Sequence, residues 1–484
     1  MKSRITPWLA GGLAVAAFVA AGFGLLDYLK QRRAAADHRA ALRDKPINTP
    51  IEFLSADLQA PLPAEIVPFF ELFARADAAR RRAALTRIEA AWQPTYASMV
   101  LEVLMLGESV PEPEALWDLL ARKTGYAGGT DYKKWSVWIW NHVPDTHPHY
   151  PEFKSLLSSN FDIRFREHFP AGVPHTIRLD EIRWGGVSRN GIPPLVRPKC
   201  IPAAAAGFLE DGHVVFGVYI DGVARAYPQR ILGWHEMVRD RIGKQEITGV
   251  YCTLCQAMIV YDSAGHTFGT SGLLYRSNKL MFDEATKSLW STFEGQPVVG
   301  PLVGKQIQLA SFPVVTTTWG EWKQRHPDTT VLSLATGHVR DYGEGVAYYA
   351  YYADDRLWFV VPHLDPVLAN KDEVLCLRDP ETPEEPVAIA VAFLKNHTLY
   401  EVRVGKLDML VLTDASGASR VYERSGRHFV AWAGADVVDD AGHSWQVSEN
   451  ALSHAGSRLP RLPAHRAFWF GWHAAYPKAR LVKD

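Results

Sequence analysis

The spacing of apolar residues divides the chain into parts of different character. The first part is an unbroken apolar run from Ile5 to Leu26, with charged residues on both sides. Over about 64–170, apolar residues recur every three or four positions, which predicts amphipathic helices. From about residue 176 onward, short β-branched and aromatic runs alternate with glycine and proline, which predicts strands and turns. We therefore predict an α+β protein with an N-terminal transmembrane helix, an α-helical domain and then two β-rich domains.

The N-terminal run decides the expected location of the protein. It spans 22 residues (26 − 5 + 1), which is enough for a helix that crosses a bilayer. The small residues Ala20, Ala21 and Gly22 leave open a cleaved signal peptide instead. Basic residues lie on both sides of the run, so the positive-inside rule does not favour one orientation in the membrane. We favour export of the large C-terminal part. We expect an anchor or signal segment over 1–30, a linker over 31–63, and a body that is periplasmic or extracellular.

The centre of the β-rich region is a predicted strand, a tight turn and a second strand between Ile247 and Asp262. The residues on either side of the turn are mostly β-branched or aromatic, as in pleated, half-buried strands. The turn carries Cys252 and Cys255. A Cys-x-x-Cys pair brings two sulfurs close enough for a disulfide or for one soft metal ion. We expect any chemistry of this chain at these two thiols.

Upstream of the turn, the sequence predicts a hairpin and a helix. Two apolar runs flank Asp221-Gly222, a dipeptide that favours a two-residue hairpin turn. Pro228 then opens a helix that we expect to continue to about Arg239. On this helix Arg239 would lie one turn from His235, and a nearby positive charge keeps an imidazole neutral.

The β-rich region also repeats itself. A block of two tryptophans and a proline recurs 150 positions later (469 − 319): Trp319, Trp322 and Pro327 correspond to Trp469, Trp472 and Pro477. This pattern predicts an internal duplication, with a first β-rich domain over 176–335 and a second, degenerate copy over 336–484. The second copy has no Cys-x-x-Cys pair, so the candidate site belongs to the first.

The leading interpretation of the thiol pair is a soft transition-metal site. Two thiolates alone do not complete a closed site, and a neutral imidazole together with thioether sulfurs suits copper or zinc. The predicted metal ligands are Cys252, Cys255, His235 and Met281, with Met258 as an additional thioether candidate. We expect Arg239 and Glu236 to support the ligand set from outside it.

Two other interpretations stay open. In the first, Cys252 and Cys255 form a thiol–disulfide oxidoreductase pair, which requires a thiolate of lowered pKa. A strand after the pair disfavours the arrangement of thioredoxin, in which a helix N-terminus lowers the pKa of the thiol. In the second, the thiols are structural and the protein is a non-catalytic envelope scaffold. The sequence therefore leaves open whether the protein is an enzyme.

A second cluster lies in the predicted helical domain. The segment from Asn141 to His149 contains three histidines, an aspartate and two prolines. Imidazole and carboxylate side chains bind metals, but histidine is also common in rigid polar loops. We favour the loop over a metal site, and regard the helical domain as the candidate surface for a protein partner.

Composition adds two limits. The net charge is −1, from 52 basic and 53 acidic residues, which gives no reason to expect nucleic acid as a partner. Four cysteines in 484 residues are too few for a disulfide scaffold. The expected partners are the membrane, through the N-terminal helix, and another protein.

Short blocks of the β-rich region match a known family pattern as a set. They are Gly185-Gly186, Gly191-Ile192-Pro193, Tyr227-Pro228, Trp234-His235-Glu236, Tyr251 to Cys255, Ser271 to Tyr275, Ser288-Leu289-Trp290, Thr318 to Trp322 and His326 to Thr329. Together they resemble the prokaryotic family called domain of unknown function 3179, over about 176–484. That family usually has proline inside the cysteine pair, where this chain has Thr253. The resemblance implies an exported or membrane-associated protein and supplies no established activity.

Overall fold

The computed structural model of the protein describes residues 62–73 and 76–484. The predicted membrane segment over 1–30 and nearly all of the predicted linker lie outside these residues. Within the described ranges, no helix combines the length and the apolar character needed to cross a bilayer. Pro63–Phe73 and Ala78–Asp484 form one compact unit of mixed α and β structure.

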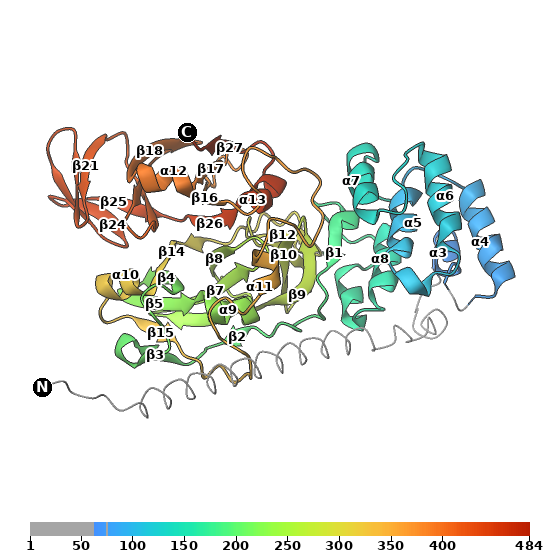
Figure 1. Ribbon diagram of the computed structural model, residues 1–484, viewed down its shortest axis with the longest axis horizontal. Coiled ribbons are helices and arrows are strands. Elements are labelled where there is room, and N and C mark those ends of the chain that lie inside the picture. Colours follow the sequence, from blue (N-terminus) through green and yellow to red (C-terminus); the bar gives the residue numbers. More distant parts are fainter. Residues whose placement is uncertain (1–61, 74–75) are drawn as a thin grey trace, which may run out of the picture. The chain divides into compact units, whose positions relative to one another are not determined.

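The first part of the described chain is helical, as the spacing predicts. All residues of its helix α5 are buried, so α5 forms the centre of the group. Lys154 donates to Glu102 on α5 at 2.7 Å, and Arg183 on β1 (Ile182–Trp184) reaches the same carboxylate at 3.3 Å, which ties the helices to the first sheet. The helices, blue to teal in Figure 1, are α3 (Val67–Phe70), α4 (Ala78–Ala90), α5 (Tyr96–Leu104), η1 (Gly107–Ser109), α6 (Pro113–Thr124), α7 (Tyr132–His142), α8 (Tyr150–Ser158) and η2 (Ile163–His168).

Three five-stranded sheets follow, and the second of them carries the cysteine turn. The first has the order β1, β9 (Phe268–Tyr275), β10 (Asn278–Asp283), β11 (Leu289–Ser291), β12 (Gln296–Val299). The second has the order β13 (Ser311–Phe312), β8 (Ala257–Asp262), β7 (Gln245–Cys252), β6 (Met237–Ile242), β2 (Leu195–Val196). The third has the order β14 (Val314–Thr318), β4 (Val214–Ile220), β5 (Val223–Pro228), β15 (Thr330–Leu332), β3 (Cys200–Pro202). Two short 3-10 helices flank strands of these sheets: η3 (Leu179–Glu181) directly precedes β1, and η4 (Ala203–Ala205) follows β3.

The predicted hairpin is present as β4 and β5. Its turn residues, Asp221 and Gly222, both have positive φ, at 52° and 79°. A two-residue turn with this geometry matches the right-handed twist of the paired strands, and the aspartate–glycine dipeptide tolerates it. The hairpin prediction is therefore confirmed.

The helix after this hairpin is shorter than predicted. The helix α9 (Gln229–His235) ends because Glu236 adopts the left-handed conformation, with φ 55°. The chain then enters β6, which pairs antiparallel with β7 along its whole length. The prediction of a helix that continues to Arg239 is wrong, since the hydrogen bonds and burial of this ladder outweigh the local helical spacing. Arg239 lies on a strand and is not the helical neighbour of His235.

The last part of the chain forms a four-stranded and an eight-stranded sheet. The four-stranded sheet has the order β26 (His465–Phe468), β16 (Glu373–Leu377), β17 (Val387–Ala390), β27 (Arg480–Val482). The eight-stranded sheet has the order β18 (Leu399–Val404), β19 (Leu407–Thr413), β20 (Ser419–Glu423), β25 (Ser457–Leu462), β24 (Ala451–His454), β23 (Ser444–Val447), β22 (Asp436–Asp439), β21 (Phe429–Ala433).

The third five-stranded sheet and the four-stranded sheet have the same order of neighbouring strands. The order β14–β4–β5–β15 corresponds to β26–β16–β17–β27, and β15 runs parallel to β5 as β27 runs parallel to β17. A tryptophan helix follows β14 and β26 in turn: α10 (Trp319–Arg325) and α13 (Trp469–Ala475). Likewise α9 follows β5 and α12 (Val391–Asn396) follows β17. The repeated Trp-x-x-Trp blocks thus hold equivalent places in two sheets.

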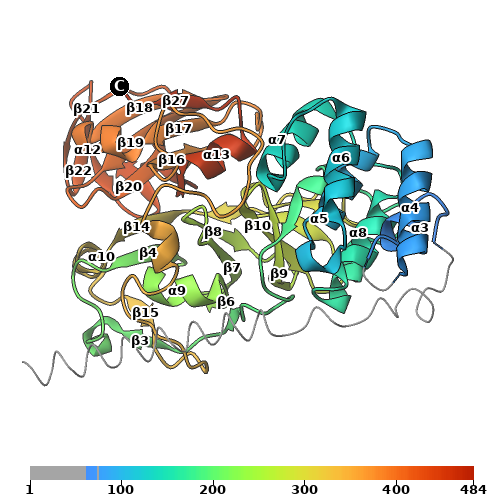
Figure 2. The ribbon, with the colours of Figure 1, turned by 45° about the vertical axis from the view of Figure 1, so that its right-hand side comes forward.

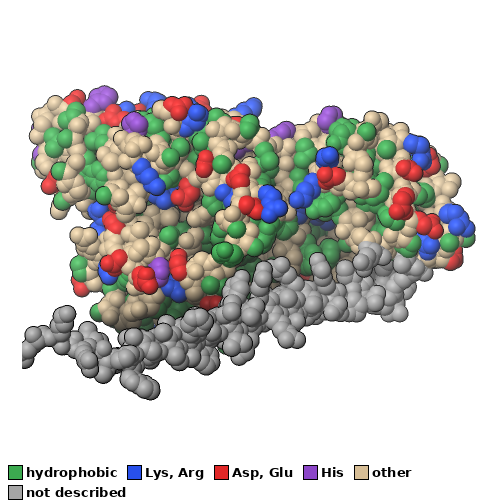
Figure 3. All heavy atoms as spheres, in the orientation of Figure 1, with side chains coloured by type: hydrophobic (Ala, Val, Ile, Leu, Met, Phe, Trp, Pro, Cys, Tyr) green, Lys and Arg blue, Asp and Glu red, His purple; other side chains and the backbone are tan. Residues whose placement is uncertain are grey.

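The two β-rich parts share a hydrophobic core. Strand β26 packs against β8 and β14, and both views in Figures 1 and 2 show the orange and red strands on that side of the green sheet. Cys252, Cys255 and Trp290 from the first part lie in one buried cluster with Cys376 and Trp472 from the second. The cysteine turn is therefore buried by both parts. On the face in Figure 3, basic and acidic side chains are interspersed, in line with the net charge of −1.

Candidate functional site

The predicted strand, turn and strand at the cysteines are confirmed. Cys252 ends β7 and Ala257 begins β8, and these two residues face each other across the ladder. All four cysteines of the chain are free thiols. Cys252 and Cys255 lie within hydrogen-bonding reach of each other. The turn thus presents two adjacent sulfurs that no disulfide joins.

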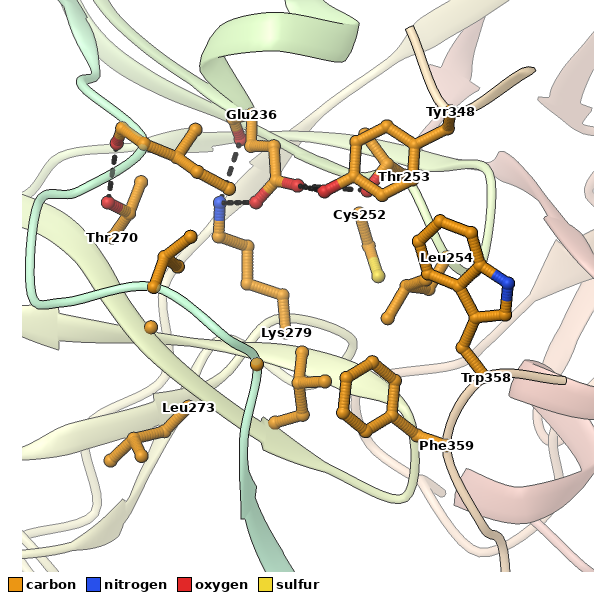
Figure 4. A pocket seen from close by; sticks show the side chains of 15 residues that line it. Glu236, Cys252, Thr253, Leu254, Thr270, Leu273, Lys279, Tyr348, Trp358 and Phe359 are labelled. Atoms are coloured by element: carbon orange, nitrogen blue, oxygen red, sulfur yellow. Dashed lines mark hydrogen bonds and ion pairs between the residues drawn. The ribbon is translucent and has the colours of Figure 1, made fainter. Parts of the chain in front are cut away.

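A pocket of about 90 Å³ opens beside Cys252 (Figure 4). Its polar side holds Glu236, Lys279 and Thr253. Figure 4 shows the sulfur of Cys252 directed toward the other, apolar side. The apolar lining consists of residues from β9 and from two further segments of chain, chiefly Leu254, Leu273, Leu274, Trp358 and Phe359.

The two thiols differ in access and in acidity. Cys252 lines the pocket and is 3% exposed, whereas Cys255 has no exposed surface. Burial by itself raises the pKa of Cys252, but hydrogen bonds to its sulfur from the Cys255 thiol and from the backbone N–H groups of Lys279 and Cys255 lower the pKa below that of an ordinary thiol. Burial, and then the neighbouring Cys252, raise the pKa of Cys255 well above its usual value. Cys252 is therefore the more accessible and the more acidic thiol of the pair.

A buried ion pair forms the polar side of the pocket. Lys279 Nζ lies 2.6 Å from Glu236 Oε2, and both side chains are almost excluded from solvent. The other carboxylate oxygen of Glu236 accepts hydrogen bonds from Tyr348 Oη at 2.7 Å and from Thr253 Oγ1 at 2.9 Å. Since a buried ion pair is stable only when its other hydrogen-bonding groups are satisfied, the two hydroxyls hold the pair in place.

Three tyrosines near α11 (Tyr349–Tyr352) cover the cysteine turn; we call Tyr348, Tyr351 and Tyr352 the tyrosine clasp. Tyr351 Oη donates to Leu254 O at 3.0 Å, and Tyr352 Oη donates to Thr253 O at 2.7 Å. Tyr348 donates to the carboxylate of the ion pair. The clasp thus engages the backbone carbonyls of the two residues between the cysteines.

Three residues around the thiols have left-handed backbone. Glu236, Gln256 and Tyr348 are not glycines and have φ of 55°, 51° and 59°. Such residues cost about 1–3 kcal/mol each and persist only where the surrounding contacts over-determine the backbone. Because left-handed residues also occur in turns elsewhere in the described chain, they do not by themselves distinguish the cysteine turn.

Cys255 is enclosed by β10 and α13. Its sulfur accepts a hydrogen bond from Asn278 Nδ2 at 3.5 Å and lies 3.6 Å from Ser277 O. On α13, a Cβ added to Gly471 would lie 2.8 Å from the Cys255 sulfur. Phe468 N–H also donates to the carbonyl of Cys255 at 2.8 Å. Of the two sulfurs, that of Cys252 is the one which a pocket ligand meets.

We expect Gly471→Ala to lower the free energy of unfolding by about 1–3 kcal/mol, because the new methyl group overlaps the sulfur and Cβ of Cys255. Chemical denaturation measures this change. Gly207→Ala is the matched control, since a Cβ at Gly207 meets no atom within 4 Å. Equal stability of the two variants would contradict the close approach of α13 to the thiol.

His235 has partners of its own. Its Nδ1 lies 2.9 Å from Pro193 O and its Nε2 lies 2.6 Å from Tyr342 Oη, so both ring nitrogens are engaged. Burial lowers the pKa of His235 to about 4, which confirms a neutral ring. The predicted cause is wrong, because burial and not Arg239 keeps the imidazole neutral. Glu236 likewise contacts Lys279 instead of the imidazole.

The predicted metal ligands are not brought together as a set. Within the described ranges, no three His, Cys, Asp or Glu side chains lie close enough to hold a metal ion. Cys252 and Cys255 are adjacent, but His235 does not join them in such a group. Met281 is fully buried in the core that contains both thiols, while Met258 belongs to a different core. The geometry gives no support to a site with four protein ligands.

The histidines of the helical part are also explained by packing. His142 stacks on Trp138 with ring centroids 4.7 Å apart. His147 and His149 approach Glu65 at 3.3 Å and 3.9 Å. In the described part of the chain this loop forms no group of metal-ligating side chains.

Stability is expected to fall as the pH drops from 6.5 toward 4. Burial lowers the pKa of His168 and of His235 to about 4 and that of His465 to about 3, against about 6.5 in an unfolded chain. Below pH 6.5 the unfolded chain therefore binds protons that the folded chain does not. Above pH 6.5 these histidines are neutral in both states, so they add no pH dependence to the free energy of unfolding. For His168 the loss by pH 4 is about 3 kcal/mol.

Urea unfolding between pH 7.5 and pH 4 measures this dependence. His168→Gln is expected to show a shallower decline than the wild type, because it removes one of the three titrating groups. A free energy of unfolding that stays constant down to pH 4 would contradict the neutral burial of these rings.

The sequence predictions omit Lys279, Thr253 and Tyr348. Lys279 is the one charged residue before Asp283 in the buried strand β10. Because a buried lysine requires a partner of opposite charge, the sequence of this strand already indicates an ion pair. Tyr348 has no local signal, because its partner Glu236 is 112 positions away.

Comparison with known proteins places the chain in one family. A family model described as a protein of unknown function (DUF3179) matches residues 189–479, which is more than half of the chain. No curated protein and no solved structure matches the chain. The matched range contains the cysteine turn, the ion pair, the clasp and α13. The chain belongs to the DUF3179 family.

Proposed function

We propose that Cys252 and Cys255 form a redox site that cycles between dithiol and disulfide. The observation that carries this proposal is the inequality of the two thiols. Cys252 faces a pocket and has a lowered pKa, whereas Cys255 is enclosed and has a raised pKa. In dithiol redox sites, the accessible thiol of lower pKa attacks the substrate and the second thiol closes the disulfide.

The reaction transfers two electrons from the thiols to an oxidised substrate. The thiolate of Cys252 attacks an electrophilic sulfur or oxygen and expels a thiolate or alkoxide, which takes up a proton. The thiol of Cys255 then loses its proton and attacks the Cys252 sulfur, which forms the disulfide and releases the second leaving group. Because the two sulfurs are already adjacent, this step needs little movement of the turn.

The ion pair acts in this proposal through the backbone of β10. The backbone N–H group of Lys279 donates to the Cys252 sulfur, and the side-chain ammonium group of Lys279 forms an ion pair with Glu236. For the formation of the thiolate, Lys279 and Glu236 thus act by position: they fix the strand whose N–H group stabilises the thiolate.

Equilibration with mixtures of reduced and oxidised dithiothreitol tests the proposal. After acid quenching and alkylation, peptide mapping is expected to find a disulfide between Cys252 and Cys255 at one reproducible potential, with Cys200 and Cys376 still reduced. Cys200→Ser is the matched control and keeps the disulfide, while Cys252→Ser loses it. Absence of the disulfide at every ratio would overturn the proposal. If loss of both thiols changes only stability, the protein is instead a non-catalytic scaffold.

A second candidate function is the binding of a single soft monovalent ion such as Cu(I). It is favoured by the adjacency of the two sulfurs in buried, apolar surroundings, where two thiolates suit such an ion. Metal analysis of protein purified without chelators separates the candidates. Equal metal content in the wild type and in Cys252→Ser would exclude this function.

We infer in addition that the chain is anchored in a membrane with its body outside the cytoplasm. The apolar run from Ile5 to Leu26 supports this inference. Retention in the membrane fraction after carbonate extraction, together with cleavage by protease added from outside the cell, is the expected result. Release by carbonate would contradict it. We also propose that the helical part of the chain binds another protein.

The shared strand order of two sheets supports an internal duplication. The repeated tryptophan helices α10 and α13 occupy equivalent places in those sheets. In this interpretation the second copy has lost the thiols and now serves to enclose Cys255, through Gly471 and Phe468.

A further inference from the structure

The size and lining of the pocket beside Cys252 restrict which oxidant reaches the thiol. Its volume is about 90 Å³, whereas sites for drug-sized ligands have about 300–1,000 Å³. Cys252 is only 3% exposed, and the clasp covers the turn next to it. A protein disulfide, or a bulky one such as oxidised glutathione, has to place both of its sulfurs in line with the attacking thiolate, and this pocket has no room for the groups attached to them.

The lining combines one polar end with an apolar remainder. Lys279, Glu236 and Thr253 lie at the polar end, while Leu254, Leu273 and the other hydrophobic lining residues form the rest. Such a pocket suits a compact molecule that has a polar, reactive group and either no further substituent or a short alkyl substituent. Hydrogen peroxide and small alkyl hydroperoxides fit this description.

We propose that the oxidant of the thiol pair is a small hydroperoxide. This inference rests on the dithiol–disulfide function proposed above and names its substrate class. The observation that carries it is the juxtaposition of a nearly enclosed nucleophilic thiol, a neighbouring second thiol and a narrow pocket with an apolar wall.

The oxidation proceeds in two balanced steps. The thiolate of Cys252 attacks the terminal oxygen of the hydroperoxide, the O–O bond breaks, and the products are a sulfenic acid on Cys252 and an alkoxide that becomes an alcohol, or water when the oxidant is hydrogen peroxide. The Cys255 thiol then attacks the sulfenic sulfur, a disulfide forms, and water leaves with the oxygen atom. Two small thiol molecules reduce the disulfide back to the dithiol and are themselves oxidised to a disulfide.

Lys279 is placed to supply a proton to the leaving oxygen. Its ammonium group has three N–H donors, and the two acceptors on Glu236, Oε2 at 2.6 Å and the carbonyl at 3.5 Å, account for two of them. Lys279 lines the pocket, so the third donor is available to an oxygen bound beside Cys252. The charge of the ammonium group also favours an oxygen that becomes negative during the reaction.

Rates of disulfide formation with three oxidants test the inference. Reduced protein is mixed with hydrogen peroxide, tert-butyl hydroperoxide or oxidised glutathione at equal concentration, quenched with acid and mapped. Both hydroperoxides are expected to form the disulfide between Cys252 and Cys255 roughly tenfold or more faster than oxidised glutathione, because the pocket excludes the larger oxidant. One equivalent of tert-butanol per disulfide is expected with the alkyl hydroperoxide. In Cys255→Ser, the sulfenic acid on Cys252 is expected to persist and to react with dimedone after denaturation.

A pair of variants checks the role of the pocket. Leu273→Phe narrows the apolar wall and is expected to slow tert-butyl hydroperoxide more than hydrogen peroxide, while Leu364→Phe, at a side chain that is 52% exposed, changes neither rate. If oxidised glutathione forms the disulfide as fast as the hydroperoxides do, the inference fails and the redox function stands. If no oxidant forms the disulfide, and equilibration with dithiothreitol does not form it either, the redox function itself fails.

Discussion

Lys279→Met is expected to lower the free energy of unfolding by about 3–5 kcal/mol, because it leaves the carboxylate of Glu236 buried without its cation. Lys279 and Glu236 are 4% and 7% exposed, so water does not replace the lost ammonium group. The hydroxyls of Tyr348 and Thr253 still donate to the carboxylate but carry no charge. Urea denaturation at pH 7.5 measures the loss.

Two further variants make this prediction specific. The double variant Glu236→Gln with Lys279→Met is expected to be less destabilised than Lys279→Met alone, since it contains no unpaired buried charge. Arg356→Met is the matched control: Arg356 lies 2.5 Å from Asp354, but its side chain is 88% exposed, so its loss is expected to change the free energy of unfolding very little. A loss in Lys279→Met as small as that of the control would contradict a buried ion pair at the site.

Cys252 is expected to react with a small alkylating reagent at pH 7 roughly tenfold or more faster than Cys200, because the thiolate is the reactive form. Burial raises the pKa of Cys200 to about 11, whereas hydrogen bonds to its sulfur lower the pKa of Cys252. Cys252 therefore has the larger thiolate fraction at pH 7. Mass spectrometry of peptides after timed exposure to iodoacetamide measures both rates in one sample.

Replacement of the second thiol separates the causes of this reactivity. Cys255→Ala removes the thiol that donates to Cys252, so the midpoint of the pH–rate profile is expected to move to higher pH. Cys200→Ser is expected to leave the profile unchanged. A rate at Cys252 equal to that at Cys200, or a midpoint that Cys255→Ala does not move, would contradict the assignment of Cys252 as the nucleophile.

Local signals account for most of what the sequence predicts correctly. The Asp221-Gly222 hairpin and the strand–turn–strand around Cys252 each depend on residues that are neighbours in the chain, and the structure contains both. The helix expected to reach Arg239 fails for the complementary reason. Its end is set by Glu236, whose left-handed backbone is held by contacts with distant residues, and by the pairing of β6 with β7.

The candidate site likewise contains residues that local sequence signals identify and residues that they do not. The sequence identifies Cys252 and Cys255 from their spacing, and it names Glu236, although as a supporter of His235 instead of the partner of Lys279. It does not predict the clasp or α13, because those contacts join residues that are roughly 100 or more positions apart. His235 is a correct prediction of a neutral, buried imidazole and gains no support as a ligand of the thiol pair.

A crystal structure of the fully oxidised protein tests the central claim most directly. The account predicts a bond of about 2.05 Å between the sulfurs of Cys252 and Cys255, with Cys200 and Cys376 still free and with Lys279 still paired to Glu236. Two separate sulfurs at the turn, in crystals of protein that has lost two thiols on titration, would contradict it.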